Sequence, residues 1–540
     1  MYRYRAEHDE KPCVPTPAGV LRRHRSRWAP LLVLSALAIA AVACSRGDVP
    51  FPRFDIPEIL FPATATPTLP SASGGAVFHP VETYLPPTLS AGVIRGSPTP
   101  DPVRTEPSIR TETAYYLVLY GDTLGSIAYQ YNVSVEELMQ VNGIWSADAL
   151  PVGMLLTIPG VEELAQGPAV KVIPDSEVVY GPASALFDVR SYVESLPGAI
   201  RTYRETIDDI PYDAAGIIQL VAERYSVNPR LLLALLEYQS RLLSSTDISE
   251  AQRLYPMGYE RSGWETLFVQ LSWAADQLNT GYYLWRAGWT GPYLFDGGYV
   301  IVPGDGVNAG TVAVQYLFSQ LEPPDVWRDA FRENGFRAVY EELFGDPFQY
   351  AVEPMLPEGL TQPDMVLPFE PGAEWSFTSG PHSAWGSGSA WAALDFAPPG
   401  NAWGCVQSEA WVTAIADGVI LRSGEGQVLL DLDGDGFEQT GWVILYLHIE
   451  SRDRVQTGEV VRAGDPIGHP SCEGGFSTGT HVHIARKYNG EWIAADGMLP
   501  FNLEGWVSAG DGIEYNGTLT RDGMVIEAYA GRSPINAISR

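Results

Sequence analysis

Two histidines separated by a single residue stand out in the last third of the sequence. His481 and His483 lie in residues 480–484, a short segment with the character of a β-strand. Side chains two positions apart on a strand point to the same face, so one imidazole can bind a metal while the other acts on a substrate. Histidines also settle into protein cores by hydrogen bonding to a carbonyl group, so this pair alone is weak evidence for a metal site.

Three further residues supply side chains that a catalytic metal site needs. A loop rich in Gly, Ser and Trp separates His382 from Asp395, and His448 ends an apolar run at 445–447. Two histidines and one aspartate form a neutral-plus-anionic set typical of catalytic zinc, which keeps its fourth tetrahedral position for water. The sequence offers no other grouping with three such ligands.

These residues fall in a region, from about 367 to 506, whose pattern predicts an all-β structure. Short apolar stretches alternate there with turns rich in Gly, Asp and Pro. The predicted strands are residues 411–416, 419–422, 428–432, 442–448 and 460–467. A sheet with short connections would bring ligands from distant parts of the chain to one metal ion.

The arrangement resembles the lysostaphin-like zinc endopeptidases of bacterial cell walls, and within them the β-lytic branch. Most members space the first histidine and the aspartate as His-x-x-x-Asp, but counting back from Asp395 leads to Trp391, which cannot bind zinc. The β-lytic branch has a longer loop, and the twelve residues between His382 and Asp395 fit it. The resemblance implies one Zn2+ with the ligands His382, Asp395 and His483, and the catalytic imidazoles His448 and His481.

A zinc ion in such a site would polarise the scissile carbonyl and lower the pKa of its water towards roughly 7. His448 and His481 would accept the proton of the water or hydrogen bond to the oxyanion of the tetrahedral intermediate. The sequence does not decide which histidine does which. The resemblance implies a peptide bond of peptidoglycan as substrate, one that involves glycine or the junction between stem and bridge.

Two of the four cysteines, Cys405 and Cys472, lie in loops that flank the predicted metal residues. In an exported domain, a disulfide between them would pin these loops. Two buried thiols, or a second metal site that includes His469, are the alternatives.

An acidic segment in the same region resembles a calcium-binding loop. Asp431, Asp433 and Asp435 alternate with other residues and with glycine, yet no glutamate stands at the twelfth position and no helices flank the segment. The pattern favours a hairpin turn, and calcium binding stays open as the alternative.

The amino terminus reads as an export signal. Four arginines between positions 22 and 27 precede an apolar run at 28–43, which is shorter than the roughly 20 residues of a membrane-spanning helix. The end of the run resembles a lipoprotein signal, in which Cys44 would be lipidated, although Ala41 stands where leucine is usual. An ordinary cleavage near a chance cysteine is the alternative. The following Pro-, Thr- and Ser-rich residues predict a disordered tether.

Residues 115–159 have the pattern of a β-α-α-β module. Asp122 or Thr123 would cap a first helix, and Ser134 would cap a second. The segment resembles a LysM module over its whole length, which implies binding to polymers that contain N-acetylglucosamine, chiefly peptidoglycan or chitin. The candidate glycan-binding residues are Gly121, Asp122, Thr123, Leu124, Asn142 and Gly143.

The middle of the chain, about 181–349, predicts mostly helices. The helix predicted at 228–243 resembles the one that leads to the catalytic acid of lysozyme-like lytic transglycosylases. Those enzymes close it with Glu-Ser, whereas Gln239 stands here, and an amide cannot protonate a leaving oxygen. Glu237 points about 200° away on the same helix. The sequence therefore predicts a structural or glycan-holding domain without glycosidase activity.

Length and charge set the frame for these parts. A chain of 540 residues is too long to fold around one hydrophobic core, so several domains are expected. A net charge of −31 would repel the phosphate backbone of a nucleic acid, which argues against nucleic acid as a partner. The predicted fold class is multidomain, with a small β-α-α-β LysM module, a mostly α-helical lysozyme-like middle domain and an all-β metallopeptidase domain. The predicted boundaries are a signal peptide at 1–43, a linker at 44–114, LysM at 115–160, a linker at 161–180, the helical domain at 181–350, the peptidase at 366–508 and its extension at 509–540.

Two functions follow from this organisation. The first is a zinc-dependent peptidoglycan endopeptidase, exported to the wall or the outer face of the cytoplasmic membrane and held there by a lipid anchor. The second is a non-catalytic peptidoglycan-binding lipoprotein that organises or regulates wall hydrolysis. The complete ligand set favours the first.

Overall fold

The computed structural model describes residues 112–119, 122–131, 133–147, 150–160, 165–295, 299–400 and 404–540. The predicted signal peptide, Cys44 and Gly121 lie outside the described residues, and so does the predicted linker apart from its last three residues. Among the described residues no helix is long and apolar enough to cross a membrane.

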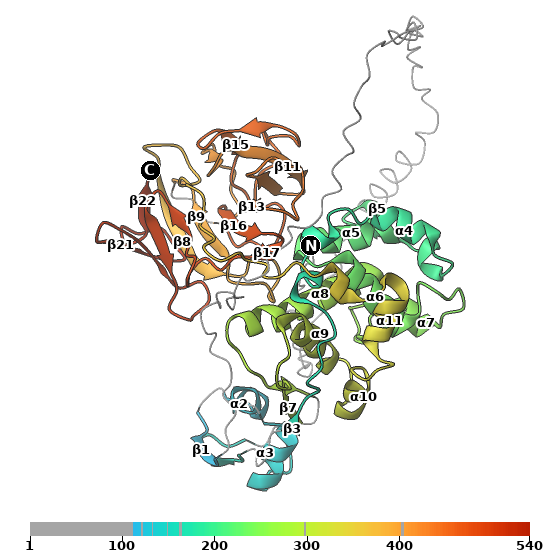
Figure 1. The fold of residues 1–540 in the computed structure, drawn as a ribbon. Helices are drawn as coiled ribbons and strands as arrows, with labels where there is room; N and C mark the ends of the chain where they lie inside the picture. The colour runs from blue at the N-terminus through green and yellow to red at the C-terminus, as the bar shows by residue number, and fades with distance from the viewer. Residues whose placement is uncertain are drawn as a thin grey trace, which may run out of the picture. The chain divides into compact units, whose positions relative to one another are not determined.

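The first described module has the predicted β-α-α-β order (Figure 1). Strand β1 (Ala114–Leu117) pairs antiparallel with β2 (Leu155–Ile158). Helices α2 (Leu124–Tyr131) and α3 (Val135–Asn142) connect them and bury a small core around Leu138. The predicted capping box of α3 is present, because the Ser134 side chain accepts the Glu137 N–H and the Glu137 side chain accepts the Ser134 N–H.

The middle region is mostly helical, as expected. Its α-helices are α4 (Val189–Ser195), α5 (Ala214–Tyr225), α6 (Pro229–Ser240), α7 (Glu250–Leu254), α8 (Leu267–Arg286), α9 (Ala309–Ser319), α10 (Pro324–Asp329) and α11 (Phe336–Phe344). Short strands accompany them, namely β3 (Ala165–Gln166), β4 (Arg204–Ile207), β5 (Ile210–Asp213), β6 (Tyr293–Leu294) and β7 (Val300–Val302). Apolar residues from α5, α6, α8 and α9 share one core.

Helix α6 ends at Ser240, three residues before the predicted end. Arg241 adopts a left-handed conformation with φ 55°, which stops the helix. The Glu237 carboxylate accepts the N–H groups of Leu243 and Ser244 at 3.0 and 3.1 Å, so it holds the chain that leaves the helix. Glu237 therefore has a structural role.

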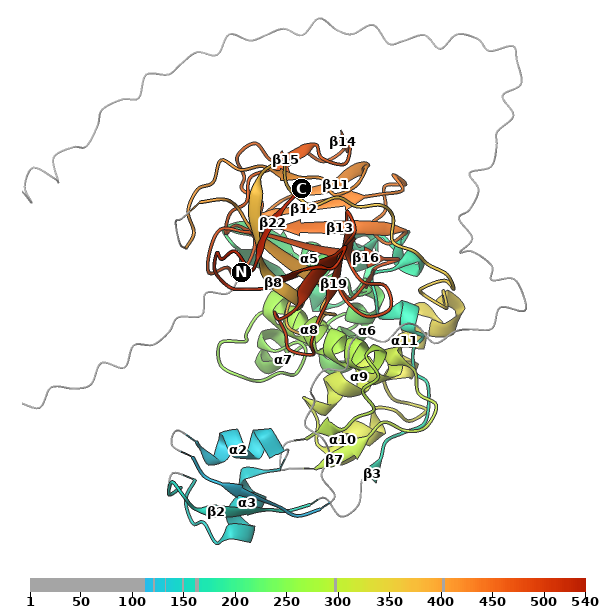
Figure 2. The same cartoon turned by 90° about the vertical axis from the view of Figure 1, so that its left-hand side faces the viewer.

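The carboxy-terminal region is built on a nine-stranded sheet, most of whose strands are labelled in Figure 2. The strands are β8 (Glu374–His382), β9 (Ala393–Ala397), β11 (Gly418–Gly424), β12 (Gln427–Asp431), β13 (Trp442–Leu447), β14 (Val460–Val461), β16 (Val482–Tyr488), β17 (Glu491–Trp492) and β22 (Ala537–Ser539). Their order is β14-β11-β12-β13-β16-β9-β8-β22, with β17 paired to β16, and every pair is antiparallel. Strand β22 brings the end of the chain into the same sheet.

The single strand expected at 460–467 is in fact two strands in different sheets. Strand β14 pairs with β11, whereas β15 (Pro466–Gly468) pairs with β10 (Val412–Thr413). A tight turn separates them, because the Asp465 carboxylate accepts the Arg462 N–H at 2.8 Å and Gly464 has φ 93°. The sequence pattern was apolar on both sides of this turn and did not reveal it.

The two faces of the sheet pack against different partners. Tyr446 and Ile484 point into a core with other parts of the β-rich region. Leu445 and Ala485, each next to one of these residues in sequence, point into the core of the helical region. Because side chains alternate along a strand, His483 lies on the same face as Ala485.

Candidate metal centre

The sheet register brings the three predicted ligands together. Asp395 on β9 and His483 on β16 are directly opposite each other, so their side chains lie on one face. His382 is the last residue of β8, which reaches it after an irregularity in the pairing with β9. All three side chains are buried.

Three ligand atoms form a nearly equilateral triangle. His382 Nε2 lies 3.1 Å from His483 Nδ1, and Asp395 Oδ1 lies 3.2 Å from each of these nitrogens. Tetrahedral zinc with bonds of about 2.0–2.1 Å places neighbouring ligand atoms about 3.3 Å apart. The spacing therefore fits one small divalent cation.

Hydrogen bonds on the outer side of each ring fix what faces the centre. His382 Nδ1–H donates to the Gly380 carbonyl at 2.8 Å, and His483 Nε2–H donates to the Ala384 carbonyl at 3.1 Å. A carbonyl only accepts, so the opposite nitrogens carry lone pairs towards the centre. Asp395 Oδ1 is buried and receives no hydrogen bond. When both rings are neutral, three acceptor atoms thus converge, which is the arrangement of a cation site.

Charges in the centre match this arrangement. Burial alone would raise the pKa of the Asp395 carboxyl, but the imidazoles of His382 and His481 hold it well below its usual range. Burial lowers the pKa of His483, and burial together with His481 and His483 lowers the pKa of His448 to about 3. Burial also acts to lower the pKa of His382, but the Asp395 carboxylate outweighs it and raises that pKa. At neutral pH the carboxylate is anionic, and His448 and His483 are neutral.

The two predicted catalytic histidines lie beside the metal residues. His481 immediately precedes β16, and its Nε2 lies 3.6 Å from Asp395 Oδ2. The rings of His448 and His481 are 4.5 Å apart. His448 follows the end of β13 with φ 66°, a strained conformation that recurs at functional sites. His448 Nδ1 donates to the Glu473 carbonyl and His481 Nδ1 donates to the Gly479 carbonyl, which leaves Nε2 of each ring as the basic nitrogen.

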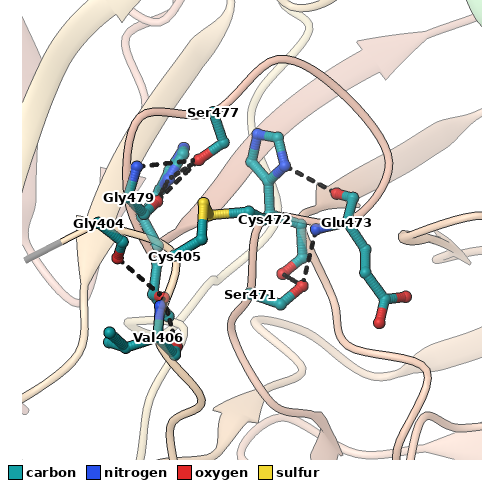
Figure 3. Close-up of a disulfide and its surroundings, with 11 residues drawn as sticks. Gly404, Cys405, Val406, Ser471, Cys472, Glu473, Ser477 and Gly479 are labelled. Carbon is teal, nitrogen blue, oxygen red and sulfur yellow. Dashed lines mark hydrogen bonds between the residues drawn. A yellow bond between two sulfur atoms is a disulfide. The ribbon is translucent and has the colours of Figure 1, made fainter. Parts of the chain in front are cut away.

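A disulfide supports these two rings. Cys405 and Cys472 are bonded, with their Cα atoms 5.7 Å apart (Figure 3). Cys472 adjoins Glu473, whose carbonyl orients His448. On the other side, the Gly404 carbonyl accepts the Thr480 N–H at 3.1 Å, next to His481. The bridge therefore ties together the two loops that hold the histidines.

A cleft gives access to the centre. A cavity of about 380 Å³ is lined by Asp395 and His481, by Thr378 of β8 and by loop residues that include Gly479 and Arg532. Backbone and small side chains make up most of its wall, so an extended chain can approach the carboxylate and the imidazole. Arg532 belongs to the predicted carboxy-terminal extension, which thus contributes to the cleft.

Two further residues of the carboxy-terminal extension reach the centre, and neither is predicted from the sequence. The Tyr515 ring stacks on His382 at 4.9 Å, and its backbone bonds to Pro381 and Gly380 hold it there. Burial, together with the charges of Glu514 and Asp395, raises the pKa of its phenol. Glu514 accepts the N–H and hydroxyl of Ser383, beside His382. No motif marks these residues, which lie far from His382 in sequence.

The LysM candidates are engaged within their own module. Thr123 caps α2 by accepting the Ser126 N–H at 3.0 Å, so Thr123 and not Asp122 is the cap. Asp122 accepts the Leu119 N–H and the Tyr116 hydroxyl. The Asn142 amide bonds to both backbone groups of Thr157 and holds β2 against α3. Gly143 ends α3 in a left-handed conformation. Glycan binding by these residues stays a prediction.

Comparison with known families divides the chain into three matches. Residues 116–159 match the LysM domain, residues 171–357 match the N-terminal domain of LasA, and residues 400–495 match peptidase family M23. The M23 match contains His448, His481 and His483, whereas His382 and Asp395 precede it. The chain therefore carries a LysM domain and a family M23 peptidase domain. The lysozyme-like resemblance of the middle region stays a prediction, because that region matches the LasA domain.

Two curated proteins extend these matches. Protease LasA of Pseudomonas aeruginosa (strain UCBPP-PA14) is 25% identical over 341 residues, which cover 60% of this chain and 75% of that protein. Beta-lytic metalloendopeptidase of Achromobacter lyticus is 31% identical over 209 residues, which cover 37% of this chain and 50% of that protein. The predicted kinship with β-lytic peptidases is confirmed, and so is the multidomain fold class.

Among solved structures, the M23 metalloprotease pseudoalterin is 25% identical over 34% of this chain and 99% of that one, with a TM-score of 0.27. A zinc-containing peptidase from Vibrio cholerae is 18% identical over 27% of this chain and 39% of that one, with a TM-score of 0.17.

Proposed function

We propose that this chain is a zinc-dependent endopeptidase that cleaves peptide bonds in cell-wall peptidoglycan. The observation that carries the proposal is the convergence of three buried potential ligand atoms, from His382, Asp395 and His483, within 3.2 Å of one another. Buried acceptors that face one another are costly unless a cation or proton lies between them. The family M23 match supports a peptidase, and this atom set supports its metal.

Zinc would be held by His382 Nε2, Asp395 Oδ1 and His483 Nδ1. The bound ion supplies a Lewis acid that polarises the scissile carbonyl and acidifies water. The Gly380 and Ala384 carbonyls keep both ligand rings in the required tautomer and orientation. The anionic Asp395 offsets part of the charge of the ion.

Three side chains would then act on the substrate. His448 and His481 each present Nε2 to the site, and one of them would accept the proton of the attacking water and return it to the leaving amine. The other would hydrogen bond to the reacting groups. Tyr515, whose phenol stays protonated because its pKa is raised, donates a hydrogen bond to the developing oxyanion.

Peptidoglycan is proposed as substrate because the chain combines the M23 domain with a LysM domain. The LysM domain would concentrate the peptidase on glycan strands, and the cleft beside Asp395 would take a peptide. Export, with Cys44 as a lipid anchor to the membrane, completes the proposal. The disulfide fits an oxidising compartment.

The test is a digestion of purified peptidoglycan by the full chain, with released amino groups as the readout. A zinc chelator is expected to stop the release, and added zinc to restore it. Release that resists chelation would contradict the zinc centre. Binding to peptidoglycan without any release would instead identify a non-catalytic wall-binding protein.

A further inference from the structure

Residues 171–357, which match the N-terminal domain of LasA, are called the LasA-type region below. Its helix α8 contacts the loop between the first two proposed zinc ligands. Asp276 lies on α8, and its Oδ1 accepts the N–H groups of Ser387 and Gly388 at 2.8 Å each. Its Oδ2 accepts the Ser387 hydroxyl at 2.7 Å. One carboxylate thus binds three donors of the 383–392 loop. Charge-assisted hydrogen bonds of this kind are roughly twice as strong as neutral ones.

The loop is shaped to lie against α8. A Cβ added to Gly388 would lie 2.0 Å from the Asp276 carbonyl oxygen, and a Cβ added to Gly386 would lie 2.4 Å from Asp276 Oδ1. Gly386 also has φ 66°, which favours glycine. Only glycine fits this close approach, so the contact depends on Asp276 in the helix and on the two glycines in the loop.

An aromatic contact also joins the loop to the helical region. The Trp385 ring meets the edge of Tyr225, at the end of α5, with ring centres 6.5 Å apart. The Arg224 guanidinium lies 5.9 Å from the Trp385 ring. The loop is therefore anchored to two helices of the same region.

The 383–392 loop, which Asp276 binds, in turn orients a proposed zinc ligand. The Ala384 carbonyl, next to Trp385, accepts the His483 Nε2–H at 3.1 Å and so leaves Nδ1 to face the centre. The Ala384 N–H bonds to Ala390 and the Trp385 N–H bonds to Ser389, which close the loop on itself. A shift of residues 386–388 would therefore be transmitted to the carbonyl that holds His483.

We propose that Asp276 is a positioning residue of the zinc centre, and that the LasA-type region helps to build this centre through the 383–392 loop. The inference rests on the proposed function. It assigns to the helical region a task other than glycan binding, since α8 acts on the metal affinity of the peptidase. By linkage, bound zinc stabilises the contact of the loop with α8 to the same extent.

The test compares the zinc affinity of apo forms of the full chain, by competition with a chromophoric chelator. Asp276→Ala is expected to weaken zinc binding about tenfold, since loss of outer supports weakens metal sites about 10- to 100-fold. Asp276→Asn, which keeps one acceptor oxygen, should restore most of it. Ser387→Ala, which removes one of the three bonds with little effect on folding, should weaken binding two- to threefold.

The matched control is Glu223→Ala. Glu223 also lies on a helix of the LasA-type region and pairs with Arg422 on β11, away from the loop. It should lower Tm without changing zinc affinity. If Asp276→Ala, Ser387→Ala and Glu223→Ala all bind zinc with the same affinity, the inference is overturned. Zinc binding by the wild type would in that case still support the proposed function. Failure of the wild type to bind zinc would sink the proposed function itself.

Discussion

Two clusters in the peptidase region combine side chains that could hold a cation, and they differ in what their atoms already do. His382, Asp395 and His483 are buried and point acceptor atoms at one another. The second cluster, Asp431, Asp433 and Asp435, runs from the last residue of β12 into the turn that follows, and only its first member is buried. Residue type alone does not separate them.

Hydrogen bonds separate the two clusters. Asp431 accepts the N–H groups of Asp433, Gly434 and Gly436 at 3.0 to 3.1 Å, and Asp435 accepts that of Phe437 at 2.8 Å. These carboxylates build the turn. The first cluster has its outer atoms bonded and its inner atoms without donors, so it is arranged for a metal. A cluster is therefore judged by its spare acceptors and not by its charge.

Replacement of His483 by alanine is expected to have the largest effect, because it removes one of the three proposed ligands. Zinc content of the purified protein, measured by atomic absorption, should be nearly lost, and peptidoglycan hydrolysis should fall by on the order of 10³-fold or more. Asp435→Asn, in the second cluster, is the control and should keep both. A full zinc content in His483→Ala would erase the difference between the clusters.

Replacement of His481 by alanine should separate metal binding from chemistry. His481 faces Asp395 Oδ2 and not the three-atom triangle, so zinc content should stay near that of the wild type. Hydrolysis should fall about 10²- to 10⁴-fold, the usual contribution of a proton-transfer or hydrogen-bonding group. Loss of zinc together with activity would show that His481 belongs to the ligand set.

Tyr515→Phe tests whether the first cluster is a working active site. Phenylalanine keeps the stacking on His382, so zinc content and Tm should not change. Loss of the hydroxyl should lower kcat about 10- to 100-fold with little change in KM. Tyr529→Phe, in the same tail, serves as the control. Unchanged kcat in Tyr515→Phe would remove the phenol from the mechanism.

The smallest expected effect lies in the second cluster. Burial, with Asp431 and Asp435 nearby, raises the pKa of Asp433 to about 6. The folded protein therefore holds this proton more tightly than the unfolded chain, and the stabilisation is lost as pH rises from about 4 through 6. Asp433→Asn should reduce the drop in Tm between pH 4 and 7 by about 1–2 °C, since the group is largely exposed.

Calcium provides the control for that measurement. Millimolar calcium should change neither the Tm of the wild type nor that of Asp433→Asn. A calcium-dependent rise in wild-type Tm that Asp433→Asn lacks would make the second cluster a metal site as well, and the comparison would fail.

Much of the fold and of the candidate site could be predicted because the signals are local or tied to a family. Alternation along residues 480–484 predicted a shared groove for His481 and His483, although β16 begins only at Val482. The longer loop between His382 and Asp395 agreed with the β-lytic resemblance. Capping chemistry predicted the start of α3 at Ser134, because that signal spans only four residues.

The remainder depends on contacts between distant segments. Tyr515 stacks on His382 from the carboxy-terminal extension, and Asp276 on α8 binds the loop beside the centre, and no spacing in the sequence links either residue to His382. The division of 460–467 into two strands depends on which neighbours are available for pairing. Such choices are made by tertiary packing and leave no local pattern.

The bridge between Cys405 and Cys472 joins positions 67 residues apart, and in the unfolded chain such a closure is worth about 4 kcal/mol. Its two ends adjoin the carbonyl groups that hold His448 and the strand entry of His481, whereas His382 and Asp395 have separate supports. Reduction of this disulfide by a low concentration of thiol is therefore expected to loosen the loops that hold His448 and His481 before the proposed metal is released. The molecule would then have a reversible off state in which it still carries its zinc.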